Sequence, residues 1–265
     1  MRVALGVEYD GSPFHGFQYQ SHDPLTVQAR LEEALSRVAA TKVSILPAGR
    51  TDAGVHASHQ IIHFDTLVIR SLNAWVLGAN AYLPPSIRVL WAAVVDHDFH
   101  ARFSARARMY RYICLRSDVK PCLLHNKVTW LLKPVDINAM RDAARYLIGE
   151  HDFSAFRASG CQAKTPTRHL ISFDISSVGD FVFFDVKANA FLQNMVRNLV
   201  GSLLQVGLGF HSSDWIGELL AQKDRRLAAA TAPPFGLYLC HVDYPASFGL
   251  IHNIPRIPFF NFLSL

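Results

Sequence analysis

The sequence predicts an α+β fold in which two similar halves share a mixed, mainly antiparallel sheet with helices against one side. Three observations support this fold class. Strand-like and amphipathic helical segments follow one another in the order strand, helix, strand, strand, helix, strand up to Val95. A similar mixture begins again near Arg102. The 265 residues are 50% apolar, which is enough to bury one large core or two moderate ones.

The first half is expected to cover residues 1–104. Apolar and β-branched residues predict a strand at 3–9, which a turn at residues 10–13 ends. Apolar side chains at helical spacing predict a helix from Thr26 to about Ala40. The remaining elements expected in this half are strands at 43–46, 58–64 and 87–95 and a helix at 72–79.

The second half is expected to cover residues 105–245. Its predicted strands lie at 106–115, 127–131, 170–175, 181–186 and 237–242, and its helices at 136–148, 191–206 and 215–221. The strands at 170–175 and 181–186 are expected to form a hairpin around Gly179. Residues 246–265 form a C-terminal tail with two prolines and several aromatic residues, either ordered against a partner subunit or loose.

Composition excludes several classes of protein. A net charge of +5 favours an anionic partner without identifying one. The four cysteines are isolated and form no C-x-x-C pair, which indicates reduced thiols in a cytoplasmic protein and neither a zinc knuckle nor a redox pair. The amino terminus acquires charge too early for a signal peptide, and no apolar run of about 18 residues predicts a membrane span.

The segment Gly49-Arg50-Thr51-Asp52-Ala53-Gly54-Val55-His56 is the leading candidate for a catalytic loop. It lies between two predicted strands, and its glycines permit a positive φ and the close approach of another chain. An ordinary turn in which Asp52 caps its own backbone is the alternative. However, a hairpin turn needs no arginine. On an extended segment, Arg50 and Asp52 would project to the same side.

The stretch from Phe99 to Arg116 is the most basic in the chain and contains no acidic residue. If a strand begins at Arg106, alternation places Arg106, Arg108, Tyr110, Tyr112 and Arg116 on one face, opposite a mostly apolar face. Arginine binds phosphate and tyrosine stacks on unpaired bases, so this face suits RNA. A solvated strand face with a chance excess of arginine is the alternative.

Two further features have competing interpretations. His56, His59 and His63 have a spacing that would suit a helix better than the predicted strand, and no carboxylate cluster accompanies them, so we expect no metal site. Arg197 lies off the apolar stripe of a predicted helix, where a surface arginine is the simplest explanation.

The octapeptide at Gly49–His56 resembles the catalytic motif of bacterial tRNA pseudouridine synthase A, and the resemblance extends from about Val3 to about Tyr244. It implies two related halves with an active-site cleft between them, no cofactor and a homodimer. It also implies a tRNA substrate, in which uridines at roughly positions 38 to 40 of the anticodon stem-loop are flipped out and isomerised.

The resemblance also implies roles for individual residues. Asp52 is the nucleophile, Arg197 points at it, Tyr110 stacks on the target base and Leu237 lines the base pocket. Because an ionised aspartate needs a cation beside it, Arg50 and Arg197 are the candidates for that role. The implied RNA contacts are Phe99, His100, Ala101, Arg102 and Phe103 in one segment, and Gly160, Cys161, Gln162, Ala163 and Lys164 in another. Phe17 and Tyr19 depart from the family, in which Trp and Arg are common at these positions.

Two other functions compete with the synthase as interpretations of the sequence. A glycosidase-like hydrolase normally needs a second carboxylate, but residues 42–64 contain no acid other than Asp52. A simple RNA-binding protein built from RRM-like halves would show a Lys/Arg-Gly-Phe-Gly-Phe run, which is absent from the sequence.

Overall fold

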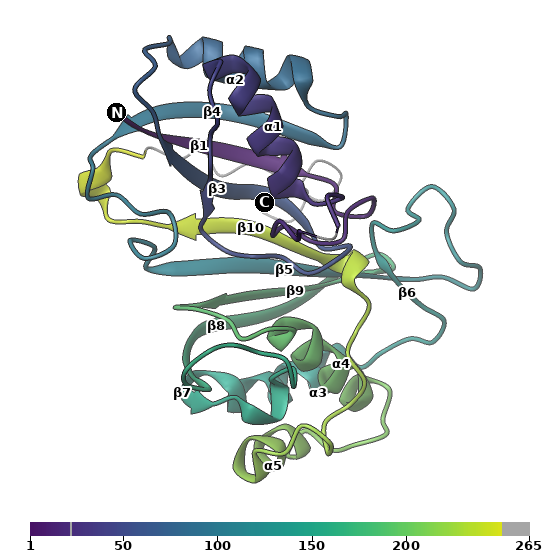
Figure 1. Ribbon diagram of the computed structural model, residues 1–265. Coiled ribbons are helices and arrows are strands. Elements are labelled where there is room, and N and C mark those ends of the chain that lie inside the picture. Colours follow the sequence, from purple (N-terminus) through teal and green to yellow (C-terminus); the bar gives the residue numbers. More distant parts are fainter. Residues whose placement is uncertain (22, 251–265) are drawn as a thin grey trace. The chain divides into compact units, whose positions relative to one another are not determined.

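The computed structural model describes residues 1–21 and 23–250 (Figure 1). The described residues form two compact units, one containing residues 1–108 and 238–250, and the other containing residues 109–237. The last strand therefore belongs to the first unit, whereas the sequence-based boundaries of 1–104 and 105–245 place it in the second half. The expected C-terminal tail lies mostly at 251–265, outside the described residues.

The first unit is built on a mainly antiparallel sheet in the order β4-β1-β3-β10. Its strands are β1 (Arg2–Tyr9), β2 (Leu46–Pro47), β3 (His56–Asp65), β4 (Ile87–Val95) and β10 (Leu237–Asp243). The first strand pairs antiparallel with both β3 and β4, while β10 runs parallel to β3, with Tyr238 opposite His56. The short β2 pairs with β3 and leads into the loop that carries Asp52.

Two helices complete this unit, α1 (Val27–Ala39) and α2 (Leu72–Tyr82). The side chains of Thr26 and Ser71 cap their amino termini by accepting hydrogen bonds from main-chain N–H groups. The helices pack against each other, and α2 packs against β4. Trp75 of α2 is fully buried, with its ring centroid 5.1 Å from that of Phe64 on β3. Both helices therefore confirm the sequence prediction.

The second unit contains its own mainly antiparallel strands in the order β5-β9-β8-β7. They are β5 (Ala107–Arg116), β6 (Thr129–Leu131), β7 (Gly149–Asp152), β8 (Thr167–Val178) and β9 (Phe181–Ala188). The predicted hairpin is confirmed: Val178 pairs with Phe181 across a turn in which Gly179 has a φ of 54°. The short β6 runs parallel to β5 and begins at Thr129.

The helices of the second unit are α3 (Ile137–Ala144), α4 (Met195–Gly207) and α5 (Trp215–Gln222). This unit also contains the short 3-10 turns η1 (Arg145–Leu147), η2 (Ser154–Phe156) and η3 (Pro234–Gly236). A fourth such turn, η4 (Ala246–Phe248), lies in the first unit. The predicted helix from Phe191 begins only at Met195, because Asn194 adopts a φ of 60°, in the left-handed region. Almost all of α4 is buried, so it is the core helix of this unit. None of the helices in the described residues could cross a membrane.

Candidate active site

Asp52 lies on the loop between β2 and β3, as the sequence predicts. Its side chain is half-buried, while Arg50 is exposed. The Val55 amide donates to the Asp52 main-chain carbonyl at 3.1 Å, and Gly54 supplies a φ of 77° in the turn that results. This turn uses the backbone of Asp52, so its geometry does not require a carboxylate at this position.

The beginning of the loop is attached to β3 by the fully buried Gln60. The Gly49 amide donates to Gln60 Oε1 at 3.3 Å, and Gln60 Nε2 donates to the Gly49 carbonyl at 2.6 Å. The Ala48 amide donates to the Ile61 carbonyl at 2.7 Å. Ala48 and Gly49, the two residues before Arg50, are thus both hydrogen-bonded to β3.

The middle of the loop is held by β1 and by the aromatic segment that follows it. The Tyr9 and Thr51 hydroxyls lie 2.8 Å apart, and the Phe17 amide donates to the Thr51 carbonyl at 3.0 Å. Burial raises the pKa of Tyr9 to about 12, so its phenol stays protonated. The Gly54 amide donates to the Phe14 carbonyl at 3.3 Å. Asp52 therefore lies between two residues whose backbones are fixed.

Two glycines outside the octapeptide allow this packing. A Cβ on Gly11 would lie 1.9 Å from the Val55 carbonyl oxygen. Gly16 has a φ of 103°, and a Cβ there would lie 3.1 Å from the Thr51 carbonyl oxygen. The sequence drew attention to Gly49 and Gly54. Gly54 does adopt a positive φ, and close approaches also occur at Gly11 and Gly16.

The histidines of β3 are buried and form structural contacts. His56 Nδ1 accepts a hydrogen bond from the Gly11 amide at 3.0 Å, and its ring stacks on Tyr238 with centroids 4.6 Å apart. His63 Nδ1 accepts a hydrogen bond from the Ala101 amide at 3.1 Å. Within residues 1–21 and 23–250, no group of three or more His, Cys, Asp or Glu side chains is arranged to hold a metal ion.

The segment from Phe99 to Phe103 is anchored by its two buried residues. Phe99 packs against His63 and Tyr244, and the Tyr244 hydroxyl donates to the Ala101 carbonyl at 2.6 Å. Burial, reinforced by the nearby His100 and Arg2, lowers the pKa of His63 to about 4, so its imidazole is a neutral acceptor. The buried side chains of Phe99 and Ala101 hold the segment in place and are not available as RNA contacts.

The same segment presents a cationic and aromatic surface. Phe103 is 76% exposed, and Arg102 is also exposed. The Arg102 guanidinium carbon lies 5.6 Å from the centroid of Phe103, and the half-buried His100 packs against the same ring at 4.3 Å. Of the five RNA contacts expected in this segment, these three have side chains that can meet a ligand.

Arg108 links this segment to the Asp52 loop. Its Nη2 atom donates to the Ala48 carbonyl at 3.0 Å and to the Arg102 carbonyl at 2.5 Å, and Nη1 donates to the Ala105 carbonyl. The sequence placed Arg108 on an RNA-binding strand face. Instead, its guanidinium joins main-chain carbonyls from two parts of the first unit.

The prediction of an exposed cationic and aromatic face on β5 is wrong for some of its residues. Tyr112 is fully buried, and its hydroxyl bonds to Thr129 Oγ1 at 2.5 Å and to the Pro233 carbonyl at 2.8 Å. Arg116 pairs with Asp118 at 2.9 Å. Alternation along a strand separates two faces but does not show which of them is covered, and here segments distant in sequence cover Tyr112.

Tyr110, Arg197 and Leu237 all belong to the second unit as residues 109–237 define it. Tyr110 is buried, with its ring edge-on to Phe191 at 5.0 Å. Arg197 Nε donates to the Ala232 carbonyl at 2.7 Å, and Nη1 donates to Asn194 Oδ1 at 3.1 Å. The surface-arginine interpretation of Arg197 is therefore wrong. Through Ala232, Arg197 holds the segment that leads into β10 at Leu237.

The second expected RNA-contact loop is ordered by Arg157. Its Nη2 atom donates to the carbonyls of Cys161 and Ala163 at 2.6 and 2.9 Å. Partial burial opposes ionisation of the Cys161 thiol, but main-chain amides and the Arg157 guanidinium outweigh it and lower the pKa of Cys161. The remaining three residues of the loop, Gly160, Gln162 and Lys164, are exposed.

Comparison with known proteins decides the family. The family model described as tRNA pseudouridine synthase matches residues 6–104 and 143–245. The tRNA pseudouridine synthase A of Shewanella amazonensis is 53% identical over 250 residues, covering 94% of this chain and 95% of the relative. This chain belongs to the tRNA pseudouridine synthase A family. The expected fold and the expected isomerase class are thereby confirmed.

Other family members agree over nearly the full length. The tRNA pseudouridine synthase A proteins of Aeromonas salmonicida and Coxiella burnetii are 52% and 49% identical, each covering 97% of this chain and 94% and 97% of their own lengths. A crystal structure of a Cbf5-Nop10-Gar1 complex overlays with a TM-score of 0.39 and 14% identity, over 89% of this chain and 48% of that chain. That overlay is too weak to add to the family assignment.

The family match covers Asp52, Arg50, Arg197 and Leu237, while Tyr110 lies in the unmatched stretch 105–142. Sequence reasoning missed Tyr9, Gln60 and Arg108 as residues that support the Asp52 loop. Gln60 had a usable signal, since it is a polar residue in the middle of an apolar strand. The contacts of Tyr9 and Arg108 join segments 42 and 60 residues apart and leave no local pattern.

Proposed function

We propose that this family member isomerises uridine to pseudouridine in tRNA, with Asp52 as the nucleophile. One observation carries the proposal: Asp52 is the single carboxylate of a loop that Gln60, Tyr9 and the 14–17 segment hold in place. Such support is typical of a side chain whose position matters to within about half an ångström. Membership of the synthase family gives the reaction class.

The reaction rearranges bonds without a net gain or loss of atoms. The bond between ribose C1′ and base N1 breaks while Asp52 forms a covalent bond to the nucleoside. The detached base rotates and a new bond forms between C1′ and C5, while the bond to Asp52 breaks and returns the free carboxylate. The C5 proton leaves and N1 gains one. Because nothing is oxidised or reduced, the reaction requires no cofactor. No metal is required either, so prolonged dialysis against a chelator is expected to leave the rate unchanged.

The proposed roles of the other residues follow from their chemistry. Asp52 must be ionised to attack, and Arg50 and Arg197 are the cations proposed to favour its charged form. Tyr110 is proposed to stack on the uracil ring and to assist loss of the C5 proton, and Leu237 to line the base site. The target uridine has to leave the helical stack, and Arg50 is proposed to fill the vacated space.

The tRNA is proposed to bind along exposed and half-buried cationic and aromatic side chains. Arg102, His100 and Phe103 offer a guanidinium for phosphate and rings for stacking. Gln162 and Lys164 offer exposed donors in the second loop. The anticodon stem-loop, at roughly positions 38 to 40, is the proposed target because the octapeptide resembles the motif of that synthase group.

Tritium release separates the proposed function from its rivals. Unfractionated tRNA labelled with tritium at uridine C5 should lose label to water while its bases remain attached. A glycosidase-like hydrolase would release free uracil, and a simple RNA-binding protein would release nothing. Retention of all tritium under single-turnover conditions, with tRNA bound, would contradict the synthase assignment.

We also propose that the chain acts in the cytoplasm as a homodimer. Several large apolar side chains of the first unit are exposed, among them Leu67, Ile69 and Leu77. Exposed apolar residues of this kind are common at contacts between subunits. Sedimentation at micromolar concentration should give a mass near twice 29.6 kDa. A single species at the monomer mass would contradict this part of the proposal.

A further inference from the structure

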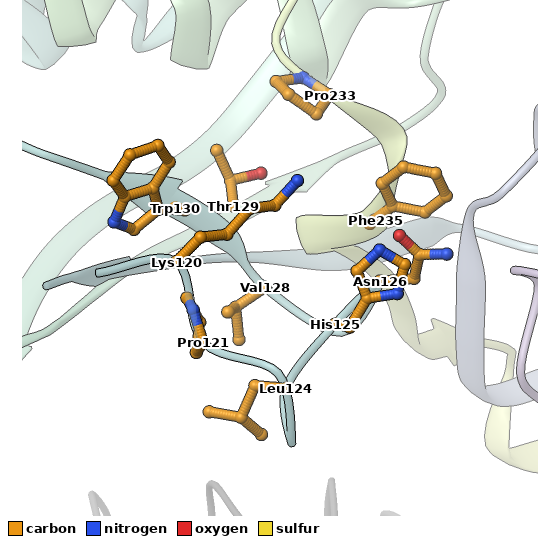
Figure 2. Close-up of a pocket in the computed structure, with 10 residues that line it drawn as sticks. All are labelled: Lys120, Pro121, Leu124, His125, Asn126, Val128, Thr129, Trp130, Pro233 and Phe235. Carbon is orange, nitrogen blue, oxygen red and sulfur yellow. The ribbon is translucent and has the colours of Figure 1, made fainter.

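A pocket of about 240 Å³ lies within the second unit, between the segment from Lys120 to Trp130 and the segment from Pro233 to Phe235. Figure 2 shows Trp130 on one side and Phe235 with Asn126 and His125 on the other, with the Lys120 side chain extended between them. Drug-sized ligands occupy sites of roughly 300–1,000 Å³, so this pocket suits a smaller group.

The aromatic walls of the pocket are fixed by the fold. Trp130 Nε1 donates to the Ser117 carbonyl at 2.7 Å, which sets the orientation of the indole. Phe235 lies on η3 beside Gly236, where an added Cβ would lie 2.7 Å from the Ile113 carbonyl oxygen and 2.9 Å from Thr129 Oγ1. The walls are therefore formed before any ligand arrives, which lowers the cost of binding a flat group.

The polar lining is cationic and amide in character. Lys120, His125 and Asn126 line the pocket, and in the described part of the chain their side chains make no hydrogen bond or ion pair. None of the described residues that line the pocket carries a carboxylate. Three unused polar groups beside two aromatic rings suit a ligand with a flat ring, hydrogen-bonding edges and a nearby negative charge.

We propose that this pocket binds one unpaired nucleobase of the RNA substrate, other than the uridine that is isomerised. The proposal rests on the function proposed above. Stacking on Trp130 or Phe235 would hold the base, His125 and Asn126 would bond its edge, and Lys120 would meet the adjacent phosphate. None of the residues proposed to handle the target uridine lines this pocket.

The pocket and the proposed site for the target base are formed by residues that are close in the protein sequence. Phe235 lines the pocket and Leu237 lines the proposed base site, and only the tightly packed Gly236 separates them. A nucleotide in the pocket would then be a near neighbour of the target uridine in the RNA. The segment 105–142, which supplies most of the pocket, lies outside the residues that the family model matches.

The test measures the affinity of an anticodon stem-loop RNA at fixed salt, with a single abasic nucleotide moved through the loop. One abasic position, outside the isomerised uridine, should weaken binding to the wild-type protein by about 10-fold, the range expected for one stacked base. In Phe235→Ala that abasic penalty should disappear. His125→Ala should also reduce the abasic penalty, but by less than Phe235→Ala. This second variant keeps the test decisive if Phe235→Ala lowers the melting temperature.

Charge variants test the phosphate contact. Asn126→Asp keeps the side-chain size and tolerates the φ of 57° at this position, but it adds a negative charge to the pocket. Asn126→Asp and Lys120→Gln should each weaken RNA binding several-fold, and more so at low salt. Lys133→Gln removes an exposed lysine that does not line the pocket and should bind like the wild type.

The outcomes separate this inference from the function on which it rests. If the loss of affinity caused by an abasic nucleotide is the same in the wild type, Phe235→Ala and His125→Ala, the pocket does not bind a nucleobase. Loss of affinity in Lys120→Gln alone would indicate a phosphate contact and would also overturn the base site. If the wild-type protein releases no tritium from C5-labelled tRNA, the synthase assignment fails, while the binding measurements still decide whether a base occupies the pocket.

Discussion

The Gln60 carboxamide and the Gly49 peptide group form a reciprocal pair, with both the N–H and the C=O of Gly49 bonded to one buried side chain. Gln60 lies on β3 and is fully buried, and both hydrogen bonds are part-buried at the start of the loop. The pair sets where the chain leaves β2 and enters the loop that carries Asp52.

Gln60→Met should damage both stability and turnover. Methionine fills a similar volume but offers no donor, so the Gly49 amide and carbonyl lose their partners at a cost of about 1–3 kcal/mol. Urea unfolding and single-turnover pseudouridine formation would measure the two effects. Gln222→Met, at an exposed position at the end of α5, is the control and should change neither. Unchanged turnover in Gln60→Met would show that the pair does not position Asp52.

Asp52→Asn should abolish turnover and spare the fold. Asparagine keeps the shape but removes the charge and most of the nucleophilicity, and the loss of a covalent catalyst raises the barrier by about 4 kcal/mol or more. Affinity for tRNA should be retained or increased, since a negative charge near RNA is removed. Asp142→Asn, at an exposed site on α3, is the matched control. Near-wild-type turnover in Asp52→Asn would rule out the nucleophile.

Tyr110 should separate stacking from proton handling. Tyr110→Phe keeps the ring packed on Phe191 and should retain RNA affinity while losing rate, whereas Tyr110→Leu should lose turnover altogether. Tyr112→Phe provides the comparison, because its hydroxyl bonds to Thr129 and Pro233. That variant should lose about 0.5–1.5 kcal/mol of stability and keep its chemistry. Unfolding of both Tyr110 variants would mark Tyr110 as a core residue.

His63 should make the protein less stable in acid. Burial first, and then His100 and Arg2, lower its pKa from 6.5 to about 4 in the folded state. As the pH falls from about 6.5 toward 4, the unfolded chain binds a proton that the folded chain does not, so the free energy of unfolding decreases over this window. His63→Asn keeps an acceptor for the Ala101 amide and cannot titrate. Its urea stability should therefore depend less on pH between 4 and 6.5, and an unchanged pH slope would contradict the assignment.

Gly16→Ala should displace the Asp52 loop. Its φ of 103° is strained for alanine, and the new Cβ would lie 3.1 Å from the Thr51 carbonyl oxygen. Gly179→Ala is the control, because its φ is 54° and its Cβ would meet nothing within 4 Å. Both variants should lose about 1 kcal/mol to backbone strain. Only Gly16→Ala should also lose turnover, and equal turnover in the two variants would contradict this prediction.

The sequence by itself determined the features that depend on local pattern. The helices at α1 and α2, the hairpin around Gly179 and the position of Asp52 between two strands follow from periodicity, capping residues and glycine placement. The octapeptide also indicated the family that the comparisons then showed. Each of these features depends on a short run of consecutive residues, so it can be predicted without knowing which distant segments are in contact.

Only the tertiary structure decided which polar and aromatic side chains are available. Tyr112 and Arg108, placed on an RNA-binding face by alternation, are committed to Pro233 and to the carbonyls of Ala48 and Arg102. The left-handed Asn194 delays the start of α4. The pocket between Trp130 and Phe235 joins residues about a hundred positions apart. Burial and hydrogen bonding are properties of packed neighbours, and those neighbours are set by the fold as a whole.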